Sequence, residues 1–155
     1  MSSENNSPGL SNCSLIVAGS RSLDQPAVNH HLVESGRRAV ARAIWAACPF
    51  DRTDVAEVVS GTARGPDRWG EAWAEPLDFV ELKRMPADWD THGKRAGPIR
   101  NEEMAQRGDA LLAFYDGESA GTRNMIETAR SEGLIVVVVD MSETSTRRVI
   151  VTGQR

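Results

Sequence analysis

The sequence predicts an α/β fold, in which a doubly wound parallel sheet of about five strands carries helices on both faces. Short apolar runs and longer stretches of helical periodicity alternate five times along the 155-residue chain. The apolar runs are rich in β-branched residues, which is typical of strands buried on both faces. With right-handed crossovers we expect the strand order 3-2-1-4-5, in which strands one and four are neighbours at the point where the order reverses.

Length and composition are typical of one globular domain. Hydrophobic residues make up 40% of the chain, and no apolar run approaches the roughly 20 residues that span a bilayer. The net charge of −4 argues against a surface that coats nucleic acid. Cys13 and Cys48 lack metal-ligand spacing, so we expect a reducing cytoplasm, no metal and no cofactor. We expect the domain over residues 14–140, with a disordered tail over 1–13 and a mostly polar tail over 141–155.

The first half of the chain contains two predicted strand–helix units. Ser14–Ala18 is a short apolar run, and the helix predicted over Ala27–Ala47 has apolar residues near period 3.6. Val55–Val59 is the second predicted strand. The next helix is expected over Arg68–Glu75, after Pro66, which suits a first helical turn.

The second half continues the alternation around one irregular segment. Leu77–Leu82 alternates enough to be the third strand, whereas Met85–Pro98 has the length of a loop that is usually functional or disordered. Further helices and strands are predicted over 99–107, 109–115, 124–130 and 134–139. In the C-terminal tail, Val149–Val151 can add an edge strand or pair with another subunit.

Glycine-rich turns follow the first, second and fourth predicted strands and would meet at one end of the sheet. Such turns expose backbone N–H groups, and the helix that follows adds partial positive charge, so they favour phosphate. The candidate ligand-binding residues in these turns are Gly19, Ser20, Arg21, Gly61, Thr62, Gly65, Asp67, Gly117, Ser119, Gly121 and Thr122. Asp67 can equally be only a helix cap.

Four further candidates lie in or just after the irregular segment: Trp89, Lys94, Arg100 and Asn101. Trp89 can stack on a base while the cations hold phosphate, or it can cover the core edge with the charges solvated. Glu71 and Glu127 are catalytic candidates if they face the crevice. Each is equally compatible with a surface position, and Glu127 with an ion pair to a neighbouring arginine.

Four sequence motifs, in consistent order between about Leu15 and Val139, carry a resemblance to a known superfamily. They are Val17-Ala18-Gly19-Ser20-Arg21, Val59-Ser60-Gly61-Thr62-Ala63-Arg64-Gly65-Pro66-Asp67, Ala87-Asp88-Trp89 with Gly97-Pro98-Ile99-Arg100-Asn101, and Asp116-Gly117 to Gly121-Thr122. Together they resemble the YspA-like branch of the SLOG superfamily. This superfamily of Rossmann-like domains also contains the LONELY GUY phosphoribohydrolases and the DNA-processing protein DprA. The resemblance implies a three-layer Rossmann-like fold.

The resemblance also implies a ligand class. It favours a domain that binds a nucleotide or nucleotide sugar, such as an ADP-ribose-like signal, as a sensor or sequestering protein that forms homo-oligomers. The alternative is hydrolysis of the N-glycosidic bond of a nucleoside 5′-monophosphate, as in the LONELY GUY enzymes. Met125 stands where the glutamate of their motif would fall, so whether this chain is an enzyme stays open. Single-stranded DNA binding, by analogy with DprA, is least favoured because the chain is acidic and poor in aromatics.

Overall fold

The structure, a computed structural model, describes residues 11–24, 29–142 and 148–153. Within these residues six strands form one sheet in the order β3-β2-β1-β4-β5-β6. Their bounds are β1 Cys13–Gly19, β2 Val55–Ser60, β3 Glu81–Arg84, β4 Ala110–Tyr115, β5 Ile135–Asp140 and β6 Arg148–Thr152. The first five strands are parallel, which confirms the predicted order, and β6 is an antiparallel edge strand beside β5.

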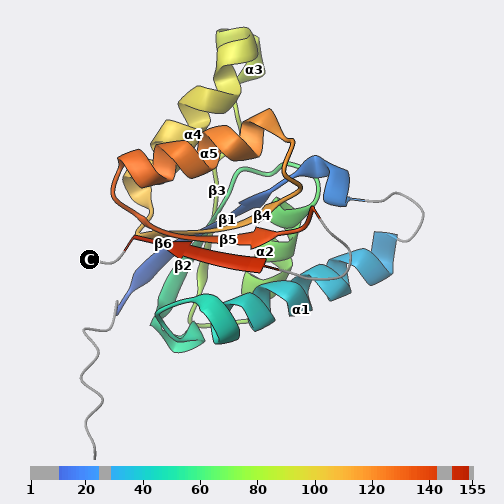
Figure 1. Cartoon of the computed structure of the whole chain (residues 1–155), viewed down its shortest axis with the longest axis vertical. Coiled ribbons are helices and arrows are strands. Elements are labelled where there is room, and N and C mark those ends of the chain that lie inside the picture. Colours follow the sequence, from blue (N-terminus) through green and yellow to red (C-terminus); the bar gives the residue numbers. More distant parts are fainter. Residues whose placement is uncertain (1–10, 25–28, 143–147, 154–155) are drawn as a thin grey trace, which may run out of the picture.

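Helices cover both faces of the sheet (Figure 1). The helices α1 (Asn29–Ala47) and α2 (Pro66–Ala74) pack on one face, and α4 (Ala96–Arg107) and α5 (Ala120–Ser131) pack on the other. The predicted three-layer Rossmann-like architecture is therefore confirmed. None of the helices in the described ranges has the length and apolar character needed to cross a membrane.

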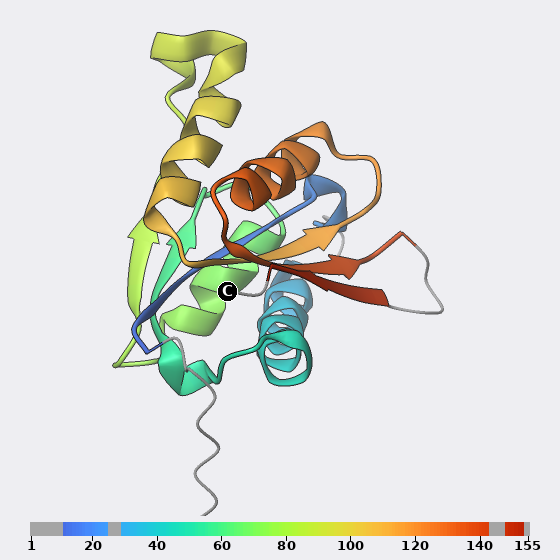
Figure 2. The ribbon, with the colours of Figure 1, turned by 60° about the vertical axis from the view of Figure 1, so that its left-hand side comes forward.

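Short helical turns complete the structure at the strand ends. The helix α3 (Trp89–His92) and the 3₁₀ turn η4 (Gly93–Arg95) precede α4 and project from the body of the domain (Figure 2). A 3₁₀ turn, η1 (Arg21–Leu23), follows β1, and another, η3 (Arg52–Asp54), precedes β2.

Alternate residues of β1 supply both halves of the core. Leu15 and Val17 face α1 and α2, whereas Ile16 and Ala18 face α4 and α5. This is the two-residue period of a central strand that is buried on both faces. Because β1 lies between β2 and β4, its carboxyl end lies near the centre of the sheet edge.

Two glycines allow α2 to lie very close to its neighbours. A Cβ added at Gly70 would lie 2.6 Å from Cβ of Val17 on β1, and one at Gly36 of α1 would overlap the ring of Trp69. Trp69 also meets Phe114 of β4 edge-on, with ring centroids 5.2 Å apart. The position of α2, which carries Asp67, is thus fixed by close packing.

The third strand and the domain boundary differ from the sequence-based expectation. β3 begins at Glu81, because the backbone N–H of Leu77 donates to Ala74 (3.0 Å) and that of Val80 to Leu77 (3.1 Å), which makes turns of the preceding residues. Cys13, expected in the tail, is fully buried and begins β1, where it pairs with Val55. Most of the expected N-terminal tail and part of the C-terminal tail lie outside the described residues.

The segment expected to be irregular is largely helical. The carboxylate of Asp88 accepts a hydrogen bond from the Thr91 N–H (3.1 Å) and caps α3, and α4 begins at Ala96 rather than Ile99. Similarly, α5 begins at Ala120 because Ser119 caps it, so the predicted turn after β4 is shorter than the sequence suggested. The long Met85–Pro98 loop was therefore a wrong prediction.

The packing of α2 yields a stability prediction. Gly70→Ala should lower the free energy of unfolding by about 1–3 kcal/mol, because the new methyl group overlaps Val17 in a filled core. Gly121→Ala is the matched control: it adds the same methyl group to a helix, but nothing lies within 4 Å of it. We expect that control to leave stability unchanged or raise it by up to about 1 kcal/mol in chemical denaturation. Equal stability of the two variants would contradict the close approach of α2 to β1.

Candidate functional site

A cavity of about 530 Å³ lies beyond the carboxyl ends of β1 and β4, where the strand order reverses. Its walls come from four places: the end of β1 with η1, the start of α2, the α3–α4 segment and the turn that leads into α5. Ten predicted site residues line it: Gly19, Arg21, Asp67, Trp89, Lys94, Arg100, Asn101, Ser119, Gly121 and Thr122. The turns after β1 and β4 thus converge as the strand order predicts.

Ser20 joins the turns after β1 and β4. Its backbone N–H donates to the carbonyl of Phe114 (3.0 Å), and its hydroxyl accepts from the Asp116 N–H (3.1 Å). The same hydroxyl lies 3.3 Å from the hydroxyl of Thr122 at the start of α5. Ser20 is completely buried and does not line the cavity, so its observed role is to hold the two turns together.

Asp116 lines the cavity but was not among the predicted site residues. Its carboxylate accepts hydrogen bonds from the hydroxyl of Ser22 (2.6 Å) and the backbone N–H groups of Glu118 and Ser119 (2.8 Å each). Desolvation by itself would raise the pKa of Asp116, but these hydrogen bonds outweigh it and lower the pKa to about 2. Asp116 is therefore ionised, and its hydrogen bonds stabilise the turn.

The N-terminus of α5 opens into the cavity. The Ser119 side chain accepts from the Thr122 N–H (3.4 Å), and the Ser119 carbonyl accepts from the Arg123 N–H (3.0 Å). The N–H groups of Ala120 and Gly121, as the first two of the helix, have no acceptor within it. Both residues line the cavity, so these donors and the helix dipole are available to an anion.

Asp67 is a buried carboxylate in the cavity wall, with 4% of its surface exposed. It is not the cap of α2, because Gly65 holds that position, and its Oδ2 accepts from the Ala63 N–H (3.1 Å). Desolvation raises the pKa of Asp67 to about 6, against the lowering effects of the Ala63 hydrogen bond and the Arg100 charge. A carboxyl group with this pKa titrates near neutral pH.

The remaining predicted residues of the second turn support the site from outside the cavity. Nη1 of Arg100 donates to the carbonyl of Gly61 (2.5 Å), and a Cβ at Gly61 would collide with that guanidinium. Thr62 and Gly65 have positive φ values of 65° and 85°. Gly65 suits such a backbone because it has no Cβ, and it allows the chain to turn into α2.

Three cations lie in the cavity lining: Arg21, Lys94 and Arg100. Burial lowers the pKa of the Arg100 guanidinium; the nearby Arg21 charge lowers it too, whereas Asp67 opposes the shift. Arg21 and Arg100 line the same cavity, so both are available to one ligand. Arg21 itself is exposed on η1.

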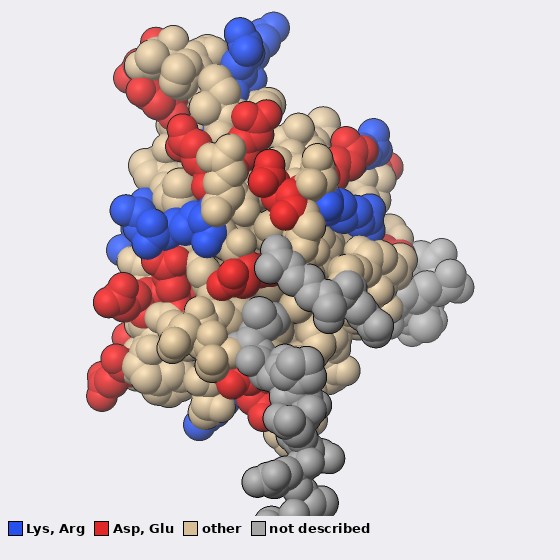
Figure 3. Space-filling view, turned by 90° about the vertical axis from the view of Figure 1, so that its left-hand side faces the viewer, with Lys and Arg blue, Asp and Glu red and all other residues tan. Residues whose placement is uncertain are grey.

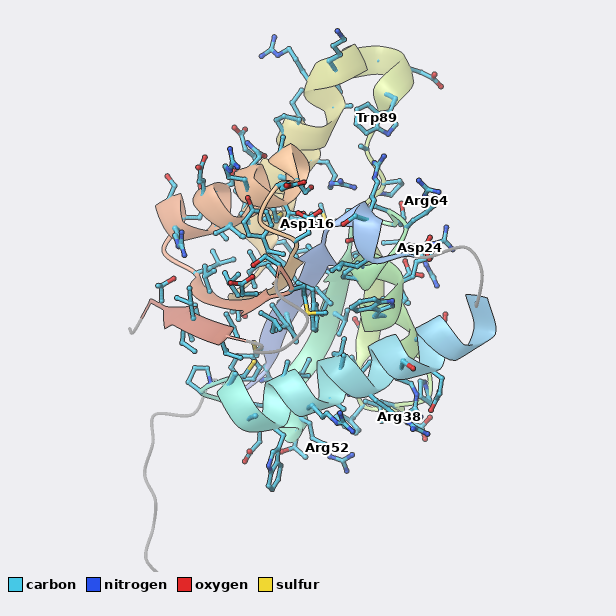
Figure 4. The ribbon with its side chains drawn as sticks, turned by 45° about the vertical axis from the view of Figure 1, so that its right-hand side comes forward. Asp24, Arg38, Arg52, Arg64, Trp89 and Asp116 are labelled. Atoms are coloured by element: carbon cyan, nitrogen blue, oxygen red, sulfur yellow. The ribbon has the colours of Figure 1, made fainter. Side chains whose placement is uncertain are left out.

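Trp89 forms the outer wall of the cavity on α3 (Figure 4). Trp89 is 51% exposed, and Cη2 at the edge of its ring lies close to Gly97 of α4, since a Cβ there would be 3.4 Å from it. Below, Nδ2 of the buried Asn101 donates to Oδ1 of Asn124 (2.9 Å) and links α4 to α5. The indole ring therefore presents exposed surface to the cavity.

The two catalytic candidates lie outside the cavity lining. Glu71 accepts from the hydroxyl of Ser60 (2.8 Å) and lies 3.5 Å from Nε of Arg84. Glu127 is exposed on α5, three residues beyond Asn124. Gly117, a predicted phosphate contact, is likewise outside the lining and has a φ of 88°, which its turn requires.

Ten lining residues were missed by sequence reasoning: Ala18, Ser22, Ala63, Gly97, Pro98, Met104, Asp116, Ala120, Asn124 and Met125. Asp116 had a usable signal, because it directly follows an apolar strand. Asn124 and Met125 were interpreted only as members of a helix. In the described part of the chain no three His, Cys, Asp or Glu side chains form a group able to hold a metal ion.

Comparison with known proteins gives one relative. No protein-family model and no solved structure matches the chain. The Gene 61 protein of Mycobacterium phage D29 is 41% identical to it over 85 residues, which cover 52% of this chain and 68% of that protein. Identity at this level over two thirds of the relative shows common descent, and the chain belongs to the family of the Gene 61 protein of Mycobacterium phage D29.

Proposed function

We propose that this protein binds a nucleotide or nucleotide sugar with an ADP-ribose-like structure and acts as a sensor or sequestering protein. The observation that carries the proposal is the cavity at the strand-order reversal, where free helix N–H groups and arginines meet an exposed indole ring. Its volume of about 530 Å³ falls in the range of about 300–1,000 Å³ that is usual for small-molecule sites.

The distribution of groups suggests how such a ligand lies. Phosphate is best accommodated at the start of α5, where the N–H groups of Ala120 and Gly121 face the cavity beside Arg21. A planar base fits against Trp89, because this indole ring is exposed and lines the cavity. The ionised Asp116 holds its turn rather than the phosphate, since its oxygens already accept three hydrogen bonds.

The resemblance to the SLOG superfamily supports the same ligand class, and we keep that assignment as part of the proposal. The free cysteines Cys13 and Cys48 fit our expectation of a reducing cytoplasm. On the face shown in Figure 3, acidic and basic side chains are interspersed rather than gathered into a basic stripe. A small anionic molecule is thus a better partner than single-stranded DNA.

Titration calorimetry with ADP-ribose, cyclic ADP-ribose, NAD and nucleoside monophosphates tests the proposal. We expect saturable binding of at least one of them and a matching rise in thermal unfolding temperature. Absence of binding across the whole panel would refute the proposed function.

Removal of one cavity cation should weaken binding without unfolding the protein. Arg21→Ala is expected to reduce the affinity for ADP-ribose by about 10- to 100-fold, because a charge-assisted hydrogen bond contributes about 1.5–3 kcal/mol. Arg64→Ala is the matched control, since Arg64 is exposed in the neighbouring turn, does not line the cavity and projects outward (Figure 4). Equal losses in both variants would point to general electrostatics instead of a site at Arg21.

Binding should also depend on pH through Asp67. Because the pKa of Asp67 is about 6, the group is mostly ionised at pH 7 and opposes an anionic ligand beside it. An anion should raise this pKa further, so binding takes up a proton and affinity increases as the pH falls through about 6. A rise of about one pKa unit corresponds to a gain in affinity of about sevenfold between about pH 7.5 and pH 5, and of about tenfold at most.

ADP-ribose is the appropriate probe, because its pyrophosphate keeps its charge throughout that pH range. Calorimetry on Asp67→Asn should give an affinity that no longer varies with pH. A pH dependence that survives this substitution would show that another group titrates.

A second candidate, N-glycosidic hydrolysis, is favoured by one observation. Asp67 and Asp116 line the same cavity with pKa values shifted in opposite directions, as in acid–base pairs of hydrolytic enzymes. Incubation with nucleoside monophosphates, followed by chromatography, should release free base if this function holds. Asp67→Asn should abolish the release, whereas Glu127→Gln, outside the cavity, should not. A bound monophosphate that stays intact would exclude the hydrolase.

A further inference from the structure

The outer surface of α1 carries an exposed tryptophan that the cavity does not use. Trp45 is 89% exposed, whereas Trp69 and Trp73 are buried. Arg42 and Ala41 precede Trp45 by three and four residues, so they share its side of the helix and are also exposed. A large apolar ring held in water is costly for an isolated domain and is typical of an interface residue.

A hollow of about 320 Å³ lies directly beside this ring. It is formed between α1 and η3 and is lined by Ala41, Ile44, Trp45, Asp51, Arg52, Thr53 and Trp73. Its wall is mostly apolar, with the Asp51 carboxylate and the Thr53 hydroxyl as acceptors. An indole ring needs this combination, because its N–H is a donor that must find an acceptor when buried.

We propose that the outer face of α1 binds a second copy of this chain across a two-fold axis, with Trp45 of each copy inserted into the hollow of the other. A two-fold interface uses the same patch on both partners, so the patch must contain both a projection and its receptor. Trp45 and the hollow beside it satisfy this requirement within one surface. The proposal is independent of the nucleotide site, which lies at the carboxyl ends of the strands.

Two charged residues near Trp45, Arg42 and Asp51, also favour a second copy of this chain as the partner. We place the two-fold axis at right angles to α1, so that the two helices run antiparallel and residues before Trp45 in one copy face residues after it in the other. Arg42, which is exposed and makes no ion pair within the described residues, then approaches the exposed Asp51 of the second copy. The axis produces this contact twice.

The two tryptophans would supply part of the area that a dimer needs. Two inserted tryptophans bury about 300–500 Å² of the roughly 1,600 Å² that a standard interface needs. The exposed residues around them on α1 and η3, among them Arg38, Ala46 and Pro49, supply the remaining contact surface.

Sedimentation equilibrium of the full chain tests the proposal. The wild-type protein should have twice the chain mass, and Trp45→Ala should return it to the mass of a monomer while the far-UV circular dichroism spectrum stays unchanged, since the side chain supports nothing within one copy. Trp89→Ala removes an exposed tryptophan at the cavity and should leave the dimer intact. A wild-type monomer at every concentration up to the millimolar range, or a dimer that survives Trp45→Ala, would overturn the proposal.

A charge exchange tests the geometry of the pair. Arg42→Glu alone and Asp51→Arg alone should each raise the dimer dissociation constant, because each places like charges opposite one another. The double variant Arg42→Glu/Asp51→Arg should dimerise more tightly than either single variant, since the ion pairs are re-formed with reversed sign, but more weakly than the wild type, because the hollow has lost the Asp51 acceptor. A double variant as weak as the sum of the single changes would overturn the antiparallel arrangement.

Discussion

The buried Ser20 hydroxyl is the contact on which the candidate site depends. Neighbouring parallel strands such as β1 and β4 end at the same edge of the sheet, and hydrogen bonds between the turns that follow them hold these turns together. Ser20 supplies two such bonds, through its N–H to Phe114 and its hydroxyl to the Asp116 N–H. Its proximity to Thr122 extends the connection to the start of α5. A serine identified as a phosphate contact thus acts as the support that places other donors at the cavity.

Two carboxylates of the cavity, Asp67 and Asp116, have pKa values that are shifted in opposite directions. Asp116 is ionised because hydrogen bonds compensate its desolvation, and its turn is rigid for the same reason. Asp67 lacks enough compensation, so its pKa lies near neutrality and its charge responds to what enters the cavity. A site with one fixed and one adjustable carboxylate can hold an anion while it responds to pH, and the same pair would suit acid–base chemistry.

The sequence predicted the sheet better than it predicted the site. Apolar runs and helical periodicity are local patterns that can be recognised in one sequence. Their alternation, with right-handed crossovers, predicted the strand order. The prediction for Met85–Pro98 was wrong because the first helical turn of this segment depends on a local cap, the Asp88 carboxylate, which accepts from the Thr91 N–H. Asp116 was missed because its importance comes from three donors that only the folded turn brings together. The position of Asp116 directly after an apolar strand was a signal of the site, but it did not reveal these hydrogen bonds.

The helix α2 connects the two surfaces for which we propose functions. Asp67 at its beginning lines the cavity that we propose for the nucleotide, and Trp73 near its end forms part of the hollow that we propose for the dimer. Coupling between the two would require α2 to move, but Gly70 holds it against Val17 and a shift of even one ångström would open the core. Because close-packed elements transmit signals only when they have a second stable arrangement, ligand binding and dimerisation should be energetically independent. A dimer dissociation constant that is the same with and without saturating nucleotide is the consequence of this packing.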